Sequence, residues 1–142
     1  MADTTEAWEA GTLVTIGYVR SALKDRDTAP RQGRDANGEA WIEVLEGYAE
    51  GLLGLEDRGW VQVICWLHLA PRDGLRVRPR GDPTVPLAGV FATRSPARPN
   101  PLAVYPARLL EVKGRWLRVS GLDAVDGTPV VDLKPHVTRL DE

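Results

Sequence analysis

The sequence predicts a mainly β protein: a small closed or nearly closed β-barrel with a short helix and long loops. Runs of β-branched and aromatic residues recur along the chain, turn signals separate them, and only one stretch has helical spacing. A length of 142 residues suits one domain with its own core, and no repeat or linker marks a second. We therefore expect residues 1–142 to form a single domain, with the polar residues 1–12 as a mobile arm.

The first half of the chain contains three strand-like segments, at Leu13–Arg20, Ala40–Leu45 and Trp60–Leu69. Residues 21–38 are charged and without periodicity, and a loop of that length in a compact domain is usually functional or disordered. The apolar spacing over Tyr48–Leu55 predicts a short amphipathic helix, interrupted by Gly51 and Gly54.

Proline divides the second half into short pieces, since eight of the eleven prolines fall between residues 71 and 106. Leu75–Arg80 alternates apolar residues with arginine and predicts a strand with one basic face. A hairpin is expected from Leu102–Val112 and Arg115–Val119, with its turn at Lys113-Gly114. The turn signal Asp126-Gly127-Thr128-Pro129 then leads the chain back to the barrel.

The charge is unevenly distributed. The net charge is −2, yet residues 71–118 hold ten Lys and Arg against three Asp and Glu, a local excess of seven positive charges. Such a basic region suits an anionic partner such as a nucleic-acid backbone, or it faces acidic strands within the fold. The acidic N-terminus lacks the apolar region of a secretory signal, and no apolar run is long enough to cross a bilayer. We expect a cytoplasmic protein.

Several common types of site are excluded by their missing signatures. The sequence has no G-x-G-x-x-G after a strand and no G-x-x-x-x-G-K-[ST], which argues against Rossmann and P-loop nucleotide sites. With Cys65, His68 and His136 as the only Cys and His residues, nothing supports a metal site. Cys65 lies in an apolar run and is expected to be a buried, inert thiol.

The stretch Gly89–Pro101 carries the clearest functional signal. It begins as a short apolar run, which predicts a strand, and continues as a loop that three prolines make stiff. Arg94 and Arg98 offer forked donors, and Asn100 offers a donor and an acceptor. These groups suit a ligand that carries a carboxylate, hydroxyls or phosphates.

This stretch resembles the signature of the TsaA-like (TrmO) family, Gly-Val-Phe-Ala-Thr-Arg-Ser-x-x-Arg-Pro-Asn-Pro, throughout. Two further family blocks follow the same order, Pro30-Arg31-Gln32 and a segment at residues 126–135. The resemblance implies a small β-barrel methyltransferase that binds S-adenosylmethionine, forms a homodimer with the cofactor near the subunit boundary, and needs no metal. It also implies a target, the exocyclic nitrogen of threonylcarbamoyl-adenosine beside the anticodon of tRNA.

The resemblance and the chemistry of the side chains together assign candidate residues. Arg94 suits the carboxylate of S-adenosylmethionine, Asp123 or Asp126 its ribose or amine, and the backbone around Val104 its adenine. The cofactor-binding candidates are Pro30, Arg31, Gln32, His68, Leu69, Arg94, Val104, Asp123, Asp126, Gly127 and Thr128. The substrate-binding candidates are Arg98, Asn100, Arg76 and Arg78, with Arg72 and Arg80 also offered to an RNA backbone. If the acceptor nitrogen must lose a proton, the candidates for general base are His136, Lys134 and Tyr105.

Three departures from the family pattern keep the acceptor open. Leu102-Ala103-Val104-Tyr105 replaces an Ile-Gly-x-Ser block, and His136 replaces a tyrosine after Lys134-Pro135. The chain also stops at Glu142, without the additional C-terminal domain of longer bacterial members. The alternatives are a methyltransferase for a small metabolite and a module that binds S-adenosylmethionine without turning it over.

Overall fold

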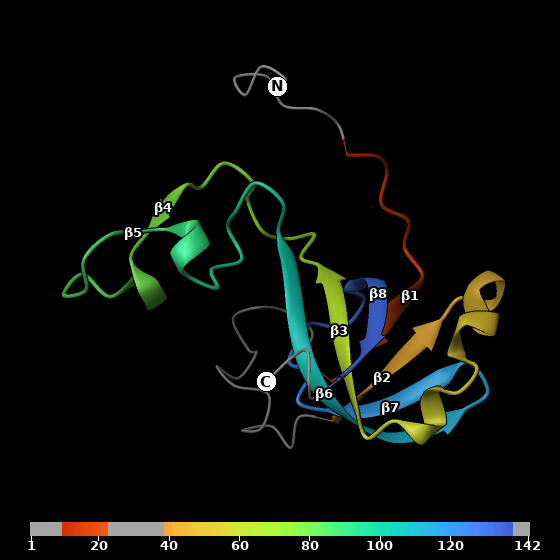
Figure 1. Cartoon of the computed structure of the whole chain (residues 1–142). Helices are drawn as coiled ribbons and strands as arrows, with labels where there is room; N and C mark the ends of the chain where they lie inside the picture. The colour runs from red at the N-terminus through yellow and green to blue at the C-terminus, as the bar shows by residue number, and fades with distance from the viewer. Residues whose placement is uncertain (1–9, 23–38, 138–142) are drawn as a thin grey trace.

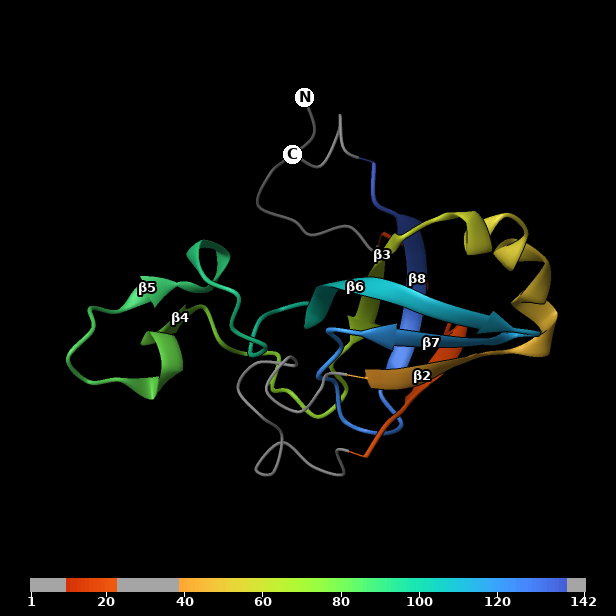
Figure 2. The same cartoon turned by 90° about the horizontal axis from the view of Figure 1, so that it is seen from below.

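A six-stranded antiparallel barrel forms the body of the protein, and a long arm extends from one of its ends (Figures 1 and 2). The computed structural model describes residues 10–22 and 39–137. The barrel order is β1–β2–β7–β6–β3–β8, and β8 closes the barrel by pairing with β1. The barrel strands are β1 (Gly17–Arg20), β2 (Glu39–Val44), β3 (Trp60–Trp66), β6 (Leu102–Lys113), β7 (Trp116–Ser120) and β8 (Pro129–Pro135). The predicted closed barrel is confirmed.

Alternation along the strands fills the barrel. In β3 every second residue, Val61, Val63 and Cys65, is fully buried, while the residues between them face outward. Ile42 of β2 and Leu117 of β7 point into the same interior. The core therefore consists of branched aliphatic side chains, which suit the pleated inner surface of a small barrel.

The hairpin of β6 and β7 forms as the sequence predicts. Gly114 occupies the turn with a φ of 61°, a left-handed conformation that glycine adopts without strain. Gly127, with a φ of 86°, occupies the predicted turn before β8. The first turn joins the paired strands β6 and β7, and the second leads the chain into β8, which pairs with β1 and β3.

Three predicted elements in the first half differ in extent or type. β1 begins only at Gly17, where the backbone approaches β2 so closely that a Cβ would lie 2.6 Å from the carbonyl oxygen of Glu43. The predicted helix consists of two 3-10 helices, η2 (Glu46–Leu52) and η3 (Leu55–Asp57), because Gly54 between them has a φ of 86°. β3 ends at Trp66, so the two residues expected at its end, His68 and Leu69, lie in the turn that follows.

The arm comprises residues 71–100 and contains very little regular structure. Its elements are β4 (Arg76–Val77), η4 (Pro79–Gly81), β5 (Ala88–Gly89) and η5 (Val90–Ala92), with β4 and β5 paired. The predicted strand at Leu75–Arg80 is wrong beyond β4, because Pro79 starts a 3-10 turn and Arg80 has a φ of 58°. The predicted strand after Gly89 is also wrong, because the Thr93 hydroxyl and amide both donate to the Val90 carbonyl and close a 3-10 turn. Within the described part of the chain, no helix has the length and apolar character needed to span a membrane.

Candidate functional site

The arm returns to the barrel through a loop, residues 93–101, that its own arginine holds closed. Arg98 Nη1 donates to the carbonyl oxygens of Thr93 and Ser95, at 3.1 Å each. On the outgoing side of the arm, Arg72 Nε donates to the Pro99 carbonyl at 2.8 Å, and its guanidinium lies over the Trp66 ring. Gly74 permits this contact between the two sides, since a Cβ there would lie 2.8 Å from the Ala97 carbonyl oxygen. The loop is therefore shaped before any ligand binds, which lowers the entropic cost of binding.

Arg94 leaves this loop toward the first residues of β6. Its Nη2 donates to the carbonyl oxygen of Val104 at 3.2 Å. A guanidinium has five N–H donors, so most of the fork remains available to a carboxylate. The side chains of Leu102 and Val104, 39% and 43% exposed, provide an apolar surface beside it. A cationic fork next to an apolar surface suits a ligand with an amino-acid carboxylate at one end and a flat apolar group at the other.

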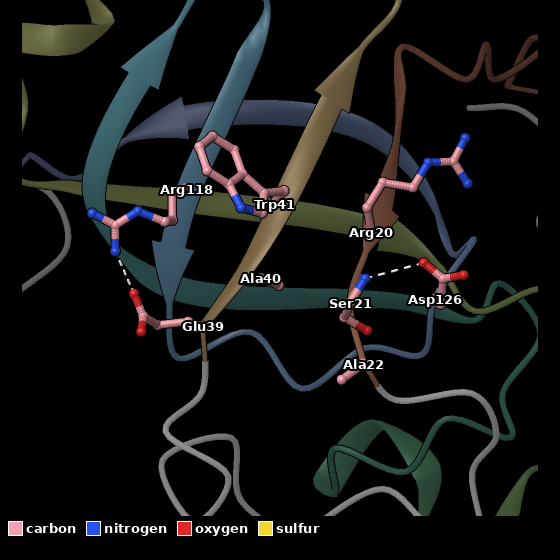
Figure 3. A pocket seen from close by; sticks show the side chains of 8 residues that line it. All are labelled: Arg20, Ser21, Ala22, Glu39, Ala40, Trp41, Arg118 and Asp126. Carbon is pink, nitrogen blue, oxygen red and sulfur yellow. Dashed lines mark hydrogen bonds and ion pairs between the residues drawn. The ribbon is translucent and has the colours of Figure 1, made fainter.

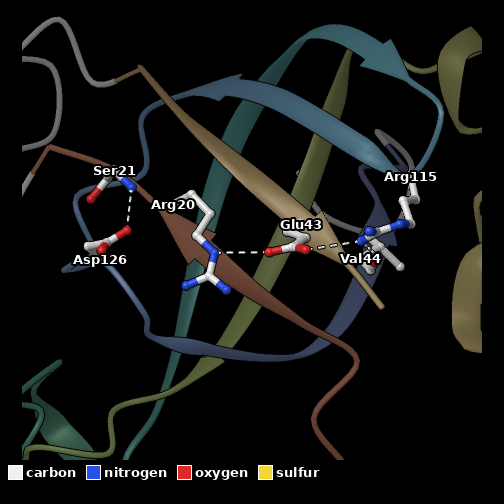
Figure 4. Close-up of polar contacts among 6 residues, drawn as sticks. All are labelled: Arg20, Ser21, Glu43, Val44, Arg115 and Asp126. Carbon is white, nitrogen blue, oxygen red and sulfur yellow. Dashed lines mark hydrogen bonds and ion pairs between the residues drawn. The ribbon is translucent and has the colours of Figure 1, made fainter. Parts of the chain in front are cut away.

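A second group of polar residues lies where β1 ends. The Ser21 amide donates to Asp126 Oδ1 at 3.0 Å, and the Ser21 hydroxyl donates to the Ala124 carbonyl at 3.2 Å (Figure 4). The Gly127 amide donates to the Val19 carbonyl at 2.7 Å. Thr128 is buried and donates its hydroxyl to the Val125 carbonyl. The turn that carries Asp126 is thus fastened to the end of β1.

A hollow of about 420 Å³ opens beside this turn (Figure 3). It is lined by Arg20, Ser21, Ala22, Glu39, Ala40, Trp41, Arg118 and Asp126. Among these residues only Asp126 was a candidate from the sequence. The others come from β1 with the two residues after it, from β2 and from β7, and the pairing of these strands is not evident from the sequence.

Three residues with titratable side chains, Cys65, Tyr105 and Asp123, are buried or partly buried in the barrel. Burial, with a contribution from Asp123, raises the pKa of Tyr105 far above its ordinary value, so the phenol keeps its proton at neutral pH. Burial also raises the pKa of the Asp123 carboxyl, and it raises the pKa of the Cys65 thiol to about 12. Cys65 is fully buried, as expected for an inert thiol.

The structure places most of the sequence candidates at this arm end of the barrel. His68 follows β3 there, close in sequence to Leu67, whose amide donates to the Pro101 carbonyl at 2.8 Å. His136 lies toward the other end, since its amide donates to the Trp60 carbonyl at 3.2 Å. Lys134 pairs with Gln62, two residues along β3 from Ile64, and Ile64 pairs with Val104, whose carbonyl accepts from Arg94.

The remaining candidates have structural partners or lie outside the described residues. Asn100 Oδ1 accepts a 3.4 Å hydrogen bond from Arg72, and Arg78 donates to the Val85 carbonyl within the arm. Because β4 is two residues long, Arg76 and Arg78 do not form a continuous basic strand face. Pro30, Arg31 and Gln32 lie outside the described residues, as do residues 1–9 of the N-terminal segment that is expected to be mobile. In the ranges 10–22 and 39–137, no group of three or more His, Cys, Asp and Glu side chains is arranged to hold a metal ion.

Comparisons with known proteins agree with this architecture. The chain is 48% identical, over 89% of its length and 90% of the relative's, to a probable S-adenosyl-L-methionine-binding protein of Methanothermobacter thermautotrophicus. It is 42% identical, over 91% of both chains, to an S-adenosyl-L-methionine-binding protein of Archaeoglobus fulgidus.

Solved structures show the same fold. The crystal structure of TrmO from Pseudomonas aeruginosa superposes with a TM-score of 0.75 at 32% identity, over 94% of this chain and 58% of that one. The protein therefore spans less than two thirds of that solved chain. The family model for the tRNA-methyltransferase O N-terminal domain matches residues 18–142. The chain belongs to the TrmO family through this N-terminal domain.

Proposed function

We propose that this protein is an S-adenosylmethionine-dependent methyltransferase whose acceptor is the exocyclic nitrogen of threonylcarbamoyl-adenosine beside the anticodon of tRNA. The observation that carries the proposal is the family match over residues 18–142, within which Arg94 lies against the start of β6. The names of the relatives from M. thermautotrophicus and A. fulgidus support the cofactor. A tRNA acceptor would place the protein in the cytoplasm.

The residues at the arm end fit this cofactor. The free donors of Arg94 suit its carboxylate, and the apolar surface of Leu102 and Val104 suits its adenine. Asp126, held by Ser21, and the half-buried Asp123 are the carboxylates available for its amine or ribose. When bound, S-adenosylmethionine supplies an electrophilic methyl group on a sulfonium.

The main contribution of the protein's own residues would be to position the methyl donor and the acceptor, with acid–base chemistry second. In-line transfer depends on holding donor and acceptor in register, which the preshaped loop at residues 93–101 provides. Because Tyr105 keeps its proton at neutral pH, we assign it hydrogen-bond donation. Asp123, whose pKa is raised by burial, is the carboxylate at this end best suited to accept a proton from the acceptor nitrogen.

We further propose a homodimer formed through one outer surface of the barrel. On the outside of β3 and β6, Trp66 faces Leu102 and Ile64 faces Val104 across the strand pair. We call this the apolar face and define it by these four residues. Two exposed arm residues, Phe91 (79%) and Leu75 (63%), add to the exposed apolar surface of the molecule. An apolar surface of this kind is typical of a subunit interface. Because Val104 belongs to it, the cofactor would lie near the subunit boundary.

The test is nucleoside mass spectrometry of tRNA incubated with the purified protein and isotopically labelled S-adenosylmethionine. A labelled methyl group on threonylcarbamoyl-adenosine is the expected result. Absence of label in RNA together with intact cofactor binding would remove the tRNA acceptor and leave a small-molecule methyltransferase or a non-catalytic binder.

The cofactor assignment has its own test in Arg94→Ala. Losing a charge-assisted donor pair should weaken S-adenosylmethionine binding by about 10- to 100-fold in calorimetry. Arg58→Ala, which removes an exposed arginine beside β3, is the matched control and should bind like the unaltered protein. Equal affinities for all three proteins would show that Arg94 does not hold the carboxylate.

A further inference from the structure

On the outer surface of β1, β2 and β7, aromatic and charged side chains alternate in two rows. Strand register places Arg20, Trp41, Arg118 and Glu111 in one row across four strands. The second row is Tyr18, Glu43, Trp116 and Lys113. We call the surface around Tyr18, Trp41 and Trp116 the aromatic face. It shares β6 with the apolar face, but Glu111 and Lys113 lie at the opposite end of that strand from Leu102 and Val104, so the two faces are separate.

Trp41 and Trp116 form a corner on this face. Their ring centroids are 6.4 Å apart and their planes meet at 77°. A hollow of about 510 Å³ opens there, lined by Trp41, Trp116, Lys113 and Gly114. A flat group that stacks on one indole would meet the other at its edge, which is a favourable arrangement of aromatic rings. Gly114 has no side chain to obstruct the hollow, and an added Cβ there would meet no atom within 4 Å.

Among the described residues of this face, every glutamate and arginine is in an ion pair, whereas one lysine is not. Glu39 and Glu111 pair with Arg118, and Glu43 pairs with Arg20 and Arg115 (Figure 4 shows the Glu43 pairs). Three glutamates and three arginines therefore cancel. Lys113 has no ion-pair partner among the described residues, and it lies at the end of β6 beside the indole corner. The corner thus combines aromatic surface with one uncompensated positive charge.

Trp41 also borders the hollow at the end of β1, where it lies between Arg20 and Arg118 (Figure 3). Open space therefore adjoins Trp41 toward the arm end and toward the β6–β7 turn. The arginines beside these rings are held in place, since the Arg115 guanidinium lies 5.9 Å from the Trp116 ring centroid and donates to the Val44 carbonyl. The face is consequently rigid before a ligand arrives.

We infer that the aromatic face binds single-stranded RNA, with a base stacked in the Trp41–Trp116 corner and a phosphate at Lys113. Base stacking on aromatic side chains beside cationic groups is the usual basis of single-strand binding, and unpaired loop bases are the usual RNA targets. The inference rests on the proposed tRNA acceptor and adds a second contact to it, away from Arg94. A protein partner is disfavoured because ion pairs separate the rings of this face and leave little continuous apolar surface to bury.

The test is fluorescence anisotropy with the full chain and a fluorescein-labelled RNA hairpin that carries a single-stranded loop. Trp41→Ala should weaken binding by about 5- to 100-fold, the range expected for losing one stacked base, and Trp41→Phe should restore most of it. Lys113→Gln should lower the slope of log affinity against log salt by about 0.7, as expected for one phosphate contact. Trp60→Ala, which removes a half-exposed tryptophan from β3, is the matched control and should leave the affinity unchanged.

The possible failures separate the inference from the proposed function. If tRNA is methylated and the hairpin binds but Trp41→Ala and Lys113→Gln behave like the unaltered protein, the aromatic face is not the RNA site and the function stands. If the unaltered protein does not bind the hairpin, the inference falls, and the labelling of tRNA decides the proposed function separately. If adenosine monophosphate alone competes as well as the loop, the corner binds free nucleotides and the RNA assignment is overturned. Circular dichroism of each variant, expected to match that of the unaltered protein, excludes misfolding as the cause of lost binding.

Discussion

The apolar face and the aromatic face are built on the same barrel, yet they offer a partner opposite chemistry. On β3 and β6 the cross-strand neighbours are apolar, as with Ile64 and Val104. On β2 and β7 each ring has a charged neighbour, as with Trp41 opposite Arg118 and Glu43 opposite Trp116. A dry, apolar surface gains most from covering by a second apolar surface. Rings separated by ion pairs keep their water and accept flat, charged ligands. One barrel can therefore offer surfaces for two kinds of partner when only the outward residues of its strands differ.

The largest expected effect comes from placing a charge on the apolar face. Ile64→Glu should weaken self-association by about 100-fold or more, because an interface would have to bury an unpaired carboxylate. Sedimentation velocity at several protein concentrations measures the change. Leu53→Glu adds the same charge to a leucine that is 94% exposed directly after η2, and it should leave association unaltered. A monomeric unaltered protein, or an unchanged dimer of Ile64→Glu, would contradict the proposed interface.

A change inside the barrel should lower the stability of the whole fold, because both faces are built on the same core. Leu117 is fully buried on β7, behind the aromatic face. Leu117→Ala should lower the free energy of unfolding by about 2–5 kcal/mol, since it leaves a cavity in a packed interior. Urea unfolding gives the value, and Leu53→Ala on the exposed surface should change it little. A small loss for Leu117→Ala would mean that the barrel interior collapses around the missing side chain.

The smallest expected effect is a change in the pH dependence of stability, caused by the ion pairs of Glu43 on the aromatic face. Hydrogen bonds from Arg115 and then Arg20 hold the pKa of Glu43 below its ordinary value. The ionised carboxylate is therefore favoured in the folded state, and its contribution is present above the ordinary carboxyl range. That contribution is lost as the pH falls through the lowered pKa of the folded protein.

Glu43→Gln should accordingly reduce stability slightly at neutral pH and flatten the acid side of the stability profile. Thermal unfolding from acidic to neutral pH measures both effects. Glu46→Gln removes an exposed carboxylate that has no ion pair among the described residues, and the profile should keep its slope. The same slope in Glu43→Gln as in the unaltered protein would show that the ion pairs of the aromatic face do not contribute to stability.

Much of the fold could be predicted from local sequence. Alternation predicted β2, an apolar run predicted β3, and the Lys113-Gly114 turn predicted the hairpin of β6 and β7. The arm could not be predicted in detail. Its strand-like runs are interrupted because Pro79 starts a turn and because Thr93 caps the turn at Val90. Such turns depend on individual side-chain hydrogen bonds, which alternation of apolar residues does not report.

The candidate site shows the same division. The sequence identified Arg94, Val104 and Asp126 from motifs, and the structure places them at the arm end of the barrel. It did not reveal that Arg98 binds carbonyls of its own loop. Nor did it show where Lys134 lies relative to Arg94, because the proximity of distant segments depends on strand register.

By itself, the sequence determined the barrel class, the family signature at residues 89–101 and the basic central region. Those properties are local, since each depends on residues within a short stretch of chain. The pairing of strands in the folded barrel sets which outward side chains share a surface. The rows of the aromatic face join residues from Tyr18 to Trp116, and the apolar face joins β3 to β6. Strand pairing and register set these neighbours, because a shift of one residue in register would turn every side chain of a strand to the opposite side.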